Sequence, residues 1–182
     1  MSLQVNIKSP GNNNLAYVQQ VIGPKGYKVE KKLGEGSYGV VYKCLNTKTG
    51  IVSAVKSIDL TKLSDNARNK YLPREIQILQ QCRHENLIQT YEIFRTSTNL
   101  FVSMQFAANG DISGYSKKNN GIKENIACKW FLQAASGLYH LHAKLFTAHR
   151  DIKTANILLD DTFKALLTDF GNLLTNNFNE LC

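Results

Sequence analysis

The sequence predicts a domain of the α+β class, with a β-rich first part followed by a helical second part. Apolar and charged residues alternate over residues 27–33, and runs rich in β-branched and aromatic residues follow at 40–45 and 51–58. Both patterns are typical of strands. Between residues 124 and 142, apolar side chains recur at helical spacing, which predicts a long amphipathic helix. A chain of 182 residues with 43% hydrophobic content can bury one core.

Composition narrows the range of partners. The net charge is +8, but Lys and Arg are scattered and form no basic run, so we expect neither a nucleic-acid nor a membrane partner. No stretch approaches the roughly 20 apolar residues of a membrane span. The four cysteines (Cys44, Cys82, Cys128 and Cys182) lack CxxC spacing. We therefore expect reduced thiols in an intracellular protein of the cytoplasm or nucleus.

Residues 1–26 have little periodicity and contain an Asn run and the Gly23-Pro24 breaker. We expect a flexible leader there, with order beginning near Tyr27.

Residues 33–41 form a Gly-rich segment of the pattern GxGxxGxV. This spacing also opens dinucleotide-binding folds, and Asp59 lies about where such a fold places its ribose carboxylate. That fold needs a helix next, whereas the following residues are β-rich and a turn at 46–50 leads into a second strand. The pattern favours a hairpin that closes over a nucleotide, in which glycines let backbone N–H groups approach phosphates; a plain hairpin with incidental glycines is the alternative.

Lys56 lies between apolar neighbours on the second strand, where an ammonium needs an anion such as a nucleotide phosphate. Residues 72–79 predict a helix with Ile76, Leu79 and Gln80 on its inward face. Glu75 on this helix is the expected ion partner of Lys56.

Residues 100–111 and the long helix that follows them lie between the Glu75 helix and the stretch that begins at His149. Residues 100–107 predict a strand that runs into a connector, and the turn at 109–111 places Asp111 as the cap of a short helix. Contact with a ribose is the alternative role for Asp111. The long helix that follows has its apolar face formed by Ile126, Trp130, Phe131, Ala134, Leu138 and Leu141.

The stretch from His149 to Asn156, followed by Asp169, has the layout of a phosphoryl-transfer site. Asp151 can accept the proton of an attacking hydroxyl, and Lys153 can steady the transferred group. Asn156 and Asp169 supply the oxygen ligands that magnesium prefers.

These motifs, in this order, resemble the eukaryotic protein kinases, and Lys153 marks the serine/threonine branch. Short phrases around residues 34–38, 71–75 and 90–94 are most similar to the testis-specific serine/threonine kinases. The resemblance implies ATP and Mg²⁺ as cofactors, protein Ser/Thr hydroxyls as substrates, and a Lys56–Glu75 ion pair. It implies nucleotide contacts at Leu33, Gly34, Gly36, Gly39, Val41, Ala54, Lys56, Met104, Gln105, Ala107, Asp111 and Leu158.

The resemblance covers about residues 27–171: a complete β-rich small lobe with its helix at 27–106 and the first part of an α-rich large lobe within 107–182. The peptide-binding platform of the family has no counterpart in the sequence. We therefore expect an exposed apolar face on the large-lobe part, which a chaperone or a full-length kinase partner would cover. Three interpretations follow: a serine/threonine kinase, a nucleotide-binding pseudokinase or regulatory fragment, and a ligand-free interaction fragment.

Overall fold

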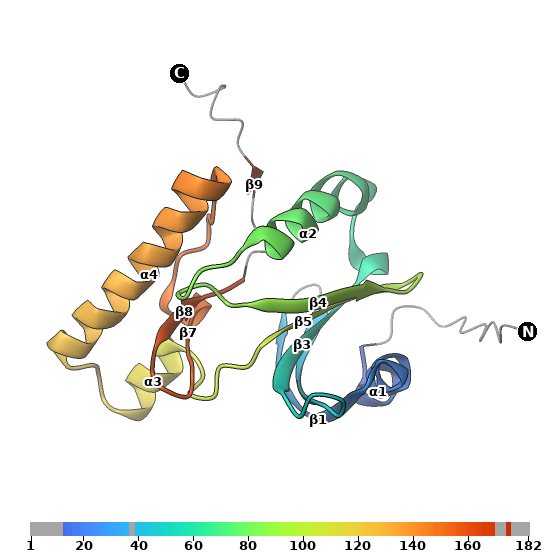
Figure 1. Ribbon diagram of the computed structural model, residues 1–182, viewed down its shortest axis with the longest axis horizontal. Coiled ribbons are helices and arrows are strands. Elements are labelled where there is room, and N and C mark those ends of the chain that lie inside the picture. Colours follow the sequence, from blue (N-terminus) through green and yellow to red (C-terminus); the bar gives the residue numbers. More distant parts are fainter. Residues whose placement is uncertain (1–12, 37–38, 170–173, 176–182) are drawn as a thin grey trace, which may run out of the picture. The chain divides into compact units, whose positions relative to one another are not determined.

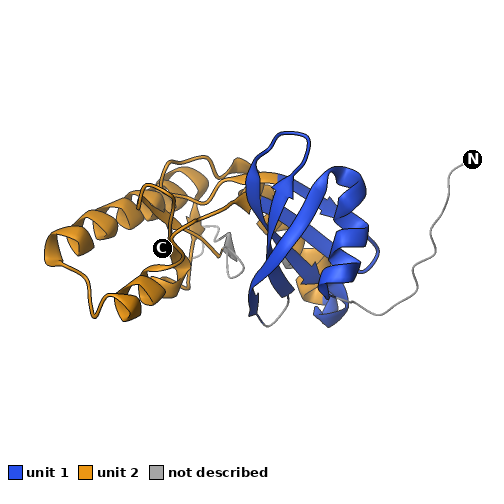
Figure 2. Cartoon of the chain, turned by 90° about the horizontal axis from the view of Figure 1, so that it is seen from below, with its two compact units in different colours: residues 1–65, 92–103 blue, residues 66–91, 104–182 orange. Residues whose placement is uncertain are grey.

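The computed structural model describes residues 13–36, 39–169 and 174–175, with the side chains of residues 71, 174 and 175 left aside. Two compact units are present: unit 1 comprises residues up to Asp65 together with Glu92–Ser103, and unit 2 comprises Asn66–Tyr91 and the residues from Met104 on (Figure 2). Strands and helices are both well represented, which confirms the α+β class (Figure 1). The helical segments are α1 (Leu15–Ile22), η1 (Gly23–Lys25), η2 (Leu60–Lys62), η3 (Ala67–Tyr71), α2 (Leu72–Gln81), α3 (Ile112–Lys118), α4 (Glu124–Leu145) and η4 (Thr154–Asn156). The strands are β1 (Tyr27–Gly36), β2 (Gly39–Asn46), β3 (Val52–Asp59), β4 (Thr90–Arg95), β5 (Asn99–Gln105), β6 (Thr147–Ala148), β7 (Ile157–Leu159), β8 (Ala165–Leu167) and β9 (Leu174–Thr175).

A five-stranded sheet of order β1-β2-β3-β5-β4 forms the body of unit 1. The strands β1, β2 and β3 are antiparallel, and the register places Val41 opposite Lys56 and Tyr42 opposite Val55. Because successive side chains point to opposite faces, Val41 and Lys56 share one face, while Tyr42 and Val55 share the other. The predicted strands at 40–45 and 51–58 are confirmed to within one or two residues at their ends.

The expectation of a flexible leader over residues 1–26 is wrong for residues 13–26, where helix α1 lies, and residues 1–12 lie outside the described residues. Tyr17, Val18 and Ile22 are buried in one cluster with apolar residues of the sheet, including Val40, Tyr42 and Val55. The helix begins at an Asn14 cap, whose side chain accepts a hydrogen bond from the N–H of Tyr17 at 2.8 Å. Short helices are marginal alone, so the apolar contact with the sheet stabilises a segment whose sequence shows few local signals.

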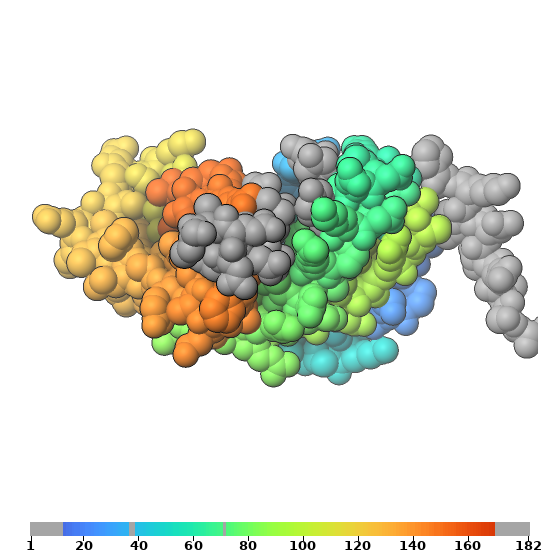
Figure 3. Space-filling view, turned by 90° about the horizontal axis from the view of Figure 1, so that it is seen from above, coloured from blue at the N-terminus to red at the C-terminus, as the bar shows by residue number. Residues whose placement is uncertain are grey.

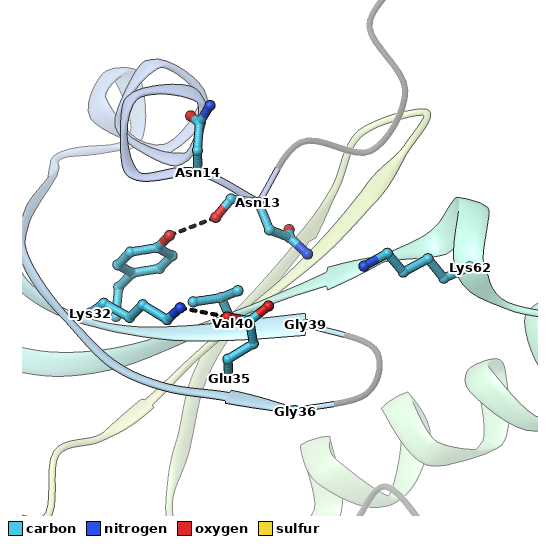
Figure 4. A pocket seen from close by; sticks show the side chains of 9 residues that line it. Asn13, Asn14, Lys32, Glu35, Gly36, Gly39, Val40 and Lys62 are labelled. Carbon is cyan, nitrogen blue, oxygen red and sulfur yellow. Dashed lines mark hydrogen bonds and ion pairs between the residues drawn. The ribbon is translucent and has the colours of Figure 1, made fainter.

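Asn13 fastens the start of α1 to the same face of the sheet. Its Oδ1 accepts hydrogen bonds from Ser57 Oγ at 2.7 Å and from Asn99 Nδ2 at 2.8 Å. Its backbone carbonyl accepts a further bond from the Tyr42 hydroxyl (Figure 4). These bonds join a polar network beneath the helix, in which Asn99 Nδ2 also donates to Ser57 Oγ at 3.3 Å.

Unit 2 contains α2, α3, α4 and the hairpin of β7 and β8. The segment after α2 joins β8 through backbone hydrogen bonds: Ile88 N–H donates to Leu167 O, and Leu167 N–H donates to Asn86 O, both at 2.9 Å. These bonds explain why residues 66–91 group with unit 2, although the expected lobe boundary near residue 106 would have placed them in the first lobe. The chain enters unit 2 again at Met104.

Two predicted helix faces differ from the observed ones. On α2 the buried residues are Leu72, Ile78 and Leu79, while Gln80 is exposed. On α4 the side chains of Trp130, Ala134 and Leu141 are buried as predicted, but Phe131 is 72% exposed. Helical spacing identifies an apolar stripe, whereas the neighbouring elements decide which part of that stripe is covered.

Several large apolar side chains lie exposed along α4 and just after it: Phe131, Leu132, Tyr139 and Phe146. The yellow and orange atoms of this region form part of the surface in the space-filling view (Figure 3). Within the part of the chain that the structure describes, no helix combines the length and apolar character needed to cross a membrane.

Candidate active site

The catalytic-loop cluster lies in unit 2, between β6 and β7, and consists of His149, Asp151, Lys153 and Asn156. Lys153 Nζ donates to Asp151 Oδ2 at 2.7 Å. Asn156 Nδ2 donates to the same oxygen at 3.0 Å and to the backbone carbonyl of Asp151 at 2.8 Å. The carboxylate of Asp151 is therefore held in a defined orientation by two side chains that the sequence analysis assigned to the site.

These bonds also set the ionisation of Asp151. The hydrogen bond from Lys153, with a smaller contribution from Asn156, holds the pKa of the Asp151 carboxyl below its usual value, because both donors favour the charged form. Asp151 and Lys153 both remain accessible to solvent. Such an exposed pair adds little to stability, so its main effect is to keep Asp151 ionised and oriented.

The buried ring of His149 holds the backbone of this loop at Asp151. Its ring is buried, with Nε2 lying 2.9 Å from the carbonyl of Thr168, and its Nδ1 accepts a hydrogen bond from the Asp151 N–H at 3.3 Å. A carbonyl can only accept, so Nε2 carries the proton and the ring is the neutral tautomer. The sequence analysis placed His149 at the start of the phosphoryl-transfer stretch and gave it no polar role of its own.

The position of Asp169 is linked to the loop through Asn156. Thr168 N–H donates to the Asn156 carbonyl at 3.0 Å, which places the segment leading to Asp169 beside η4. Asp169 and Arg150 both have positive φ, 64° and 66°. Non-glycine residues in this region are strained and are found preferentially at functional sites. Phe170 and Gly171 lie outside the described residues.

Leu158 and Asp111 also meet in unit 2. They form an isolated antiparallel bridge, and the Leu159 N–H donates to Gly110 O at 2.7 Å. The Asp111 side chain accepts from the Gly114 N–H at 2.8 Å, which confirms its role as the cap of α3. Its possible contact with a ribose stays a prediction.

The Gly-rich hairpin lies in unit 1. Gly34 and Gly36 have open space where a Cβ would be, whereas a Cβ on Gly39 would lie 2.1 Å from the carbonyl oxygen of Ser57. The close approach of β3 therefore requires glycine at position 39. This structural requirement is independent of any contact between Gly39 and a phosphate.

A polar cavity of about 330 Å³ adjoins this hairpin and includes Asn13, Val40, Tyr42 and Lys62 in its lining (Figure 4). Val40 and Tyr42 belong to the sheet face that α1 covers, and the lining also includes Gly36 and Gly39 of the hairpin. Val41 and Lys56 project from the opposite face, so we do not assign this cavity to the nucleotide.

The remaining predicted residues occupy the expected elements. Leu33 is in β1, Ala54 and Lys56 are in β3, Met104 and Gln105 end β5, Ala107 follows it, and Glu75 is in the first turn of α2. The register places Ala54 and Lys56 on one face with Val41. Lys56 and Glu75 belong to different units, so their ion pair stays a prediction.

The glycine hairpin with its strand lysine, and an Asp-Lys-Asn loop ordered by hydrogen bonds, define a protein of the nucleotide-dependent phosphotransferase class. Comparison with known proteins identifies the family within this class. The family model described as "Protein kinase domain" matches residues 27–178, so the chain belongs to the protein kinase family.

Two of the similar relatives are named as serine/threonine-protein kinases. Testis-specific serine/threonine-protein kinase 4 of Homo sapiens is 39% identical over 146 residues, which cover 80% of this chain and 44% of that protein. Testis-specific serine/threonine-protein kinase 1 of Mus musculus is 38% identical over 152 residues, covering 83% of this chain and 41% of that protein. The resemblance to this group is confirmed. The chain spans less than half the length of these two relatives.

Proposed function

We propose that this chain carries the nucleotide-binding and catalytic-loop residues of a serine/threonine protein kinase that transfers the γ-phosphoryl group of ATP to protein hydroxyls. The observation that carries the proposal is the Asp151 carboxylate, oriented by Lys153 and Asn156 within hydrogen-bond distance. An ionised, oriented carboxylate can accept the proton of an attacking Ser or Thr hydroxyl. Lys153 is exposed, and its long side chain has several rotatable bonds, so its ammonium can move from Asp151 to a phosphoryl oxygen.

The residues that would hold Mg²⁺ fit a hard cation. The amide nitrogen of Asn156 donates its hydrogen bonds to Asp151, so its Oδ1 can serve as a metal ligand. Asp169 adds a carboxylate as a second ligand. Over residues 13–36, 39–169 and 174–175, no group of three or more His, Cys, Asp or Glu side chains is arranged to hold a metal. Magnesium is usually bound by one or two protein oxygens together with phosphates, and Asn156 and Asp169 would be those protein ligands. When bound, the ion neutralises phosphate charge during transfer.

The features of unit 1 support ATP as the nucleotide. Lys56, Val41 and Ala54 share the sheet face left uncovered by α1. An ammonium on that face can pair with phosphate oxygens, and the small side chain of Ala54 leaves room for a purine beside it. The open space at Gly34 and Gly36 lets their N–H groups approach phosphates.

The test is phosphoryl transfer by the purified 182-residue chain from Mg-ATP to a generic Ser/Thr protein substrate. Replacing Asp151 with Asn keeps the shape of the side chain and removes the proton acceptor, so we expect a loss of about 10²-fold or more. Equal transfer by both proteins would exclude Asp151 as the base. A rise in melting temperature with Mg-ATP, but no transfer, would instead favour the nucleotide-binding pseudokinase or regulatory fragment.

We also propose that a protein partner, either a chaperone or a full-length kinase, covers the exposed face of α4. The apolar side chains of Phe131, Leu132 and Tyr139 support this proposal, since contiguous exposed apolar surface favours association. Replacing these three residues with Ser should weaken association with a purified full-length kinase in analytical ultracentrifugation. Unchanged association would exclude this face.

A further inference from the structure

Asn13 makes hydrogen bonds to three adjacent strands of the unit 1 sheet. Its backbone carbonyl accepts a bond from the Tyr42 hydroxyl of β2. Its Oδ1 accepts bonds from Ser57 Oγ of β3 at 2.7 Å and from Asn99 Nδ2 of β5 at 2.8 Å. The sheet order makes β2, β3 and β5 neighbours, so these bonds meet at one point just before helix α1 begins. We call this set of bonds the Asn13 tie.

The side chains that Asn13 joins are buried. Ser57 and Asn99 are 0% exposed, and Tyr42 is 3% exposed. Tyr17 of α1 belongs to the same network, because its hydroxyl donates to Asn99 Oδ1 at 3.2 Å. Hydrogen bonds have defined geometry, and a buried donor that loses its acceptor costs free energy. The Asn13 tie therefore holds β2, β3 and β5 in place against the segment that leads into α1.

The tied positions lie next to residues of the predicted phosphate site. Tyr42 follows Val41 in β2, Ser57 follows Lys56 in β3, and the register pairs Val41 with Lys56. Successive side chains point to opposite faces, so the tie holds these strands from one face while Val41 and Lys56 project from the other. Gly39 approaches β3 so closely that a Cβ would lie 2.1 Å from the Ser57 carbonyl oxygen. A shift of β2 against β3 would therefore move both the glycine hairpin and Lys56.

The Asn13 tie lies outside the part of the chain that the family model matches. That match begins at residue 27, whereas α1 ends at Ile22. Membership of the protein kinase family therefore accounts for the sheet and the glycine hairpin, but not for the bonds that Asn13 makes to them.

We propose that Asn13 is a positioning residue for nucleotide binding, which acts through Tyr42 and Ser57 to hold the glycine hairpin and Lys56 in the arrangement that meets the phosphates of ATP. Groups that are ordered before the ligand arrives lower the cost of binding. Without the tie, only a fraction of the molecules has the competent arrangement, and the apparent affinity falls by that fraction. This inference rests on ATP as the nucleotide under the proposed function, and adds to it a residue on the opposite face of the sheet.

The test is the dissociation constant of Mg-ATP for the 182-residue chain, measured by titration calorimetry at a temperature where every variant is folded. Asn13→Ala removes the Oδ1 acceptor, whereas Asn13→Asp keeps an acceptor at that place. Gln19→Ala is the matched control, because Gln19 joins α1 to β1 by two hydrogen bonds, to the Tyr27 carbonyl at 3.1 Å and from the Val29 N–H at 2.7 Å. These bonds lie at the end of β1 away from the glycine hairpin.

We expect Asn13→Ala to weaken Mg-ATP binding about fivefold or more, and Asn13→Asp to bind within about twofold of the wild-type chain. Gln19→Ala should lower the melting temperature but leave the dissociation constant unchanged. A merely structural role of Asn13 would instead give both alanine variants the same affinity. Ser57→Ala removes the β3 partner of one bond and should weaken binding in the same direction, which keeps the test decisive if Asn13→Ala does not fold.

Amide hydrogen exchange without nucleotide, read by mass spectrometry, separates this inference from the proposed function. Asn13→Ala should speed exchange in peptides that cover β2 and β3, whereas Gln19→Ala should speed it at the start of β1. If the wild-type chain bound no Mg-ATP, the proposed nucleotide would be wrong, and exchange would then decide whether the tie orders these strands. Exchange in β2 and β3 that is unchanged by Asn13→Ala, or a measurable Mg-ATP affinity that is unchanged by it, would overturn the proposal.

Discussion

Helix α1 should contribute directly to the stability of unit 1, and replacing Ile22 with Ala tests this most sharply. Ile22 is fully buried at the end of the helix, in one cluster with Val18 and the apolar side chains of the sheet. If residues before Tyr27 were a flexible leader, shortening this side chain would cost nothing.

The expected magnitude follows from the atoms removed. Ile→Ala deletes three carbons, each worth about 0.8 kcal/mol of transfer free energy when buried, which gives about 2.4 kcal/mol. The cavity left behind adds to this, and such substitutions in cores cost about 2–5 kcal/mol in total. Leu15→Ala on the same helix is the control, because Leu15 is 44% exposed and its truncation should change the free energy of unfolding by less than about 0.5 kcal/mol.

The assay is urea unfolding followed by far-UV circular dichroism. The single tryptophan, Trp130, lies in unit 2, so its fluorescence reports on that unit instead. A midpoint for Ile22→Ala equal to that of Leu15→Ala would refute the packing of α1 on the sheet.

Three further predictions concern the glycine hairpin, a histidine and the catalytic loop. Gly39→Ala should destabilise by about 1–3 kcal/mol, because its Cβ would overlap the backbone of β3, whereas Gly34→Ala has open space and should leave the unfolding midpoint nearly unchanged. Burial lowers the pKa of His84, and a neighbouring histidine makes a smaller contribution in the same direction. The folded state therefore disfavours the charged form of this ring. The free energy of unfolding should have its full value above about pH 6.5 and should fall as the pH drops through the folded pKa. His84→Gln should flatten this decline in urea midpoints, and an unaltered slope would contradict it. Lys153→Met should raise the pKa of Asp151 and move the acid limb of the kcat/KM profile to higher pH, while an unmoved limb would show that the hydrogen bond does not set that pKa.

The catalytic loop was largely predictable because its chemistry is local in sequence. Asp151, Lys153 and Asn156 lie within six positions, and the structure joins all three by hydrogen bonds. The bond from His149 to the Thr168 carbonyl spans 19 positions and left only a weak trace in the sequence. Long-range polar contacts of this kind depend on how two segments meet, which local spacing does not encode.

Local sequence patterns predicted the α+β class, the alternating strands of the glycine hairpin and the kinase-like order of motifs, because side-chain periodicity and short-range chemistry are local properties. Tertiary structure alone decided that α1 is ordered, since its burial needs a sheet face built from residues up to Phe101. It also decided that Phe131 is exposed while the adjacent Trp130 is buried against the ring of Tyr115. Burial depends on which surfaces meet across the fold, and that information is spread over the whole chain.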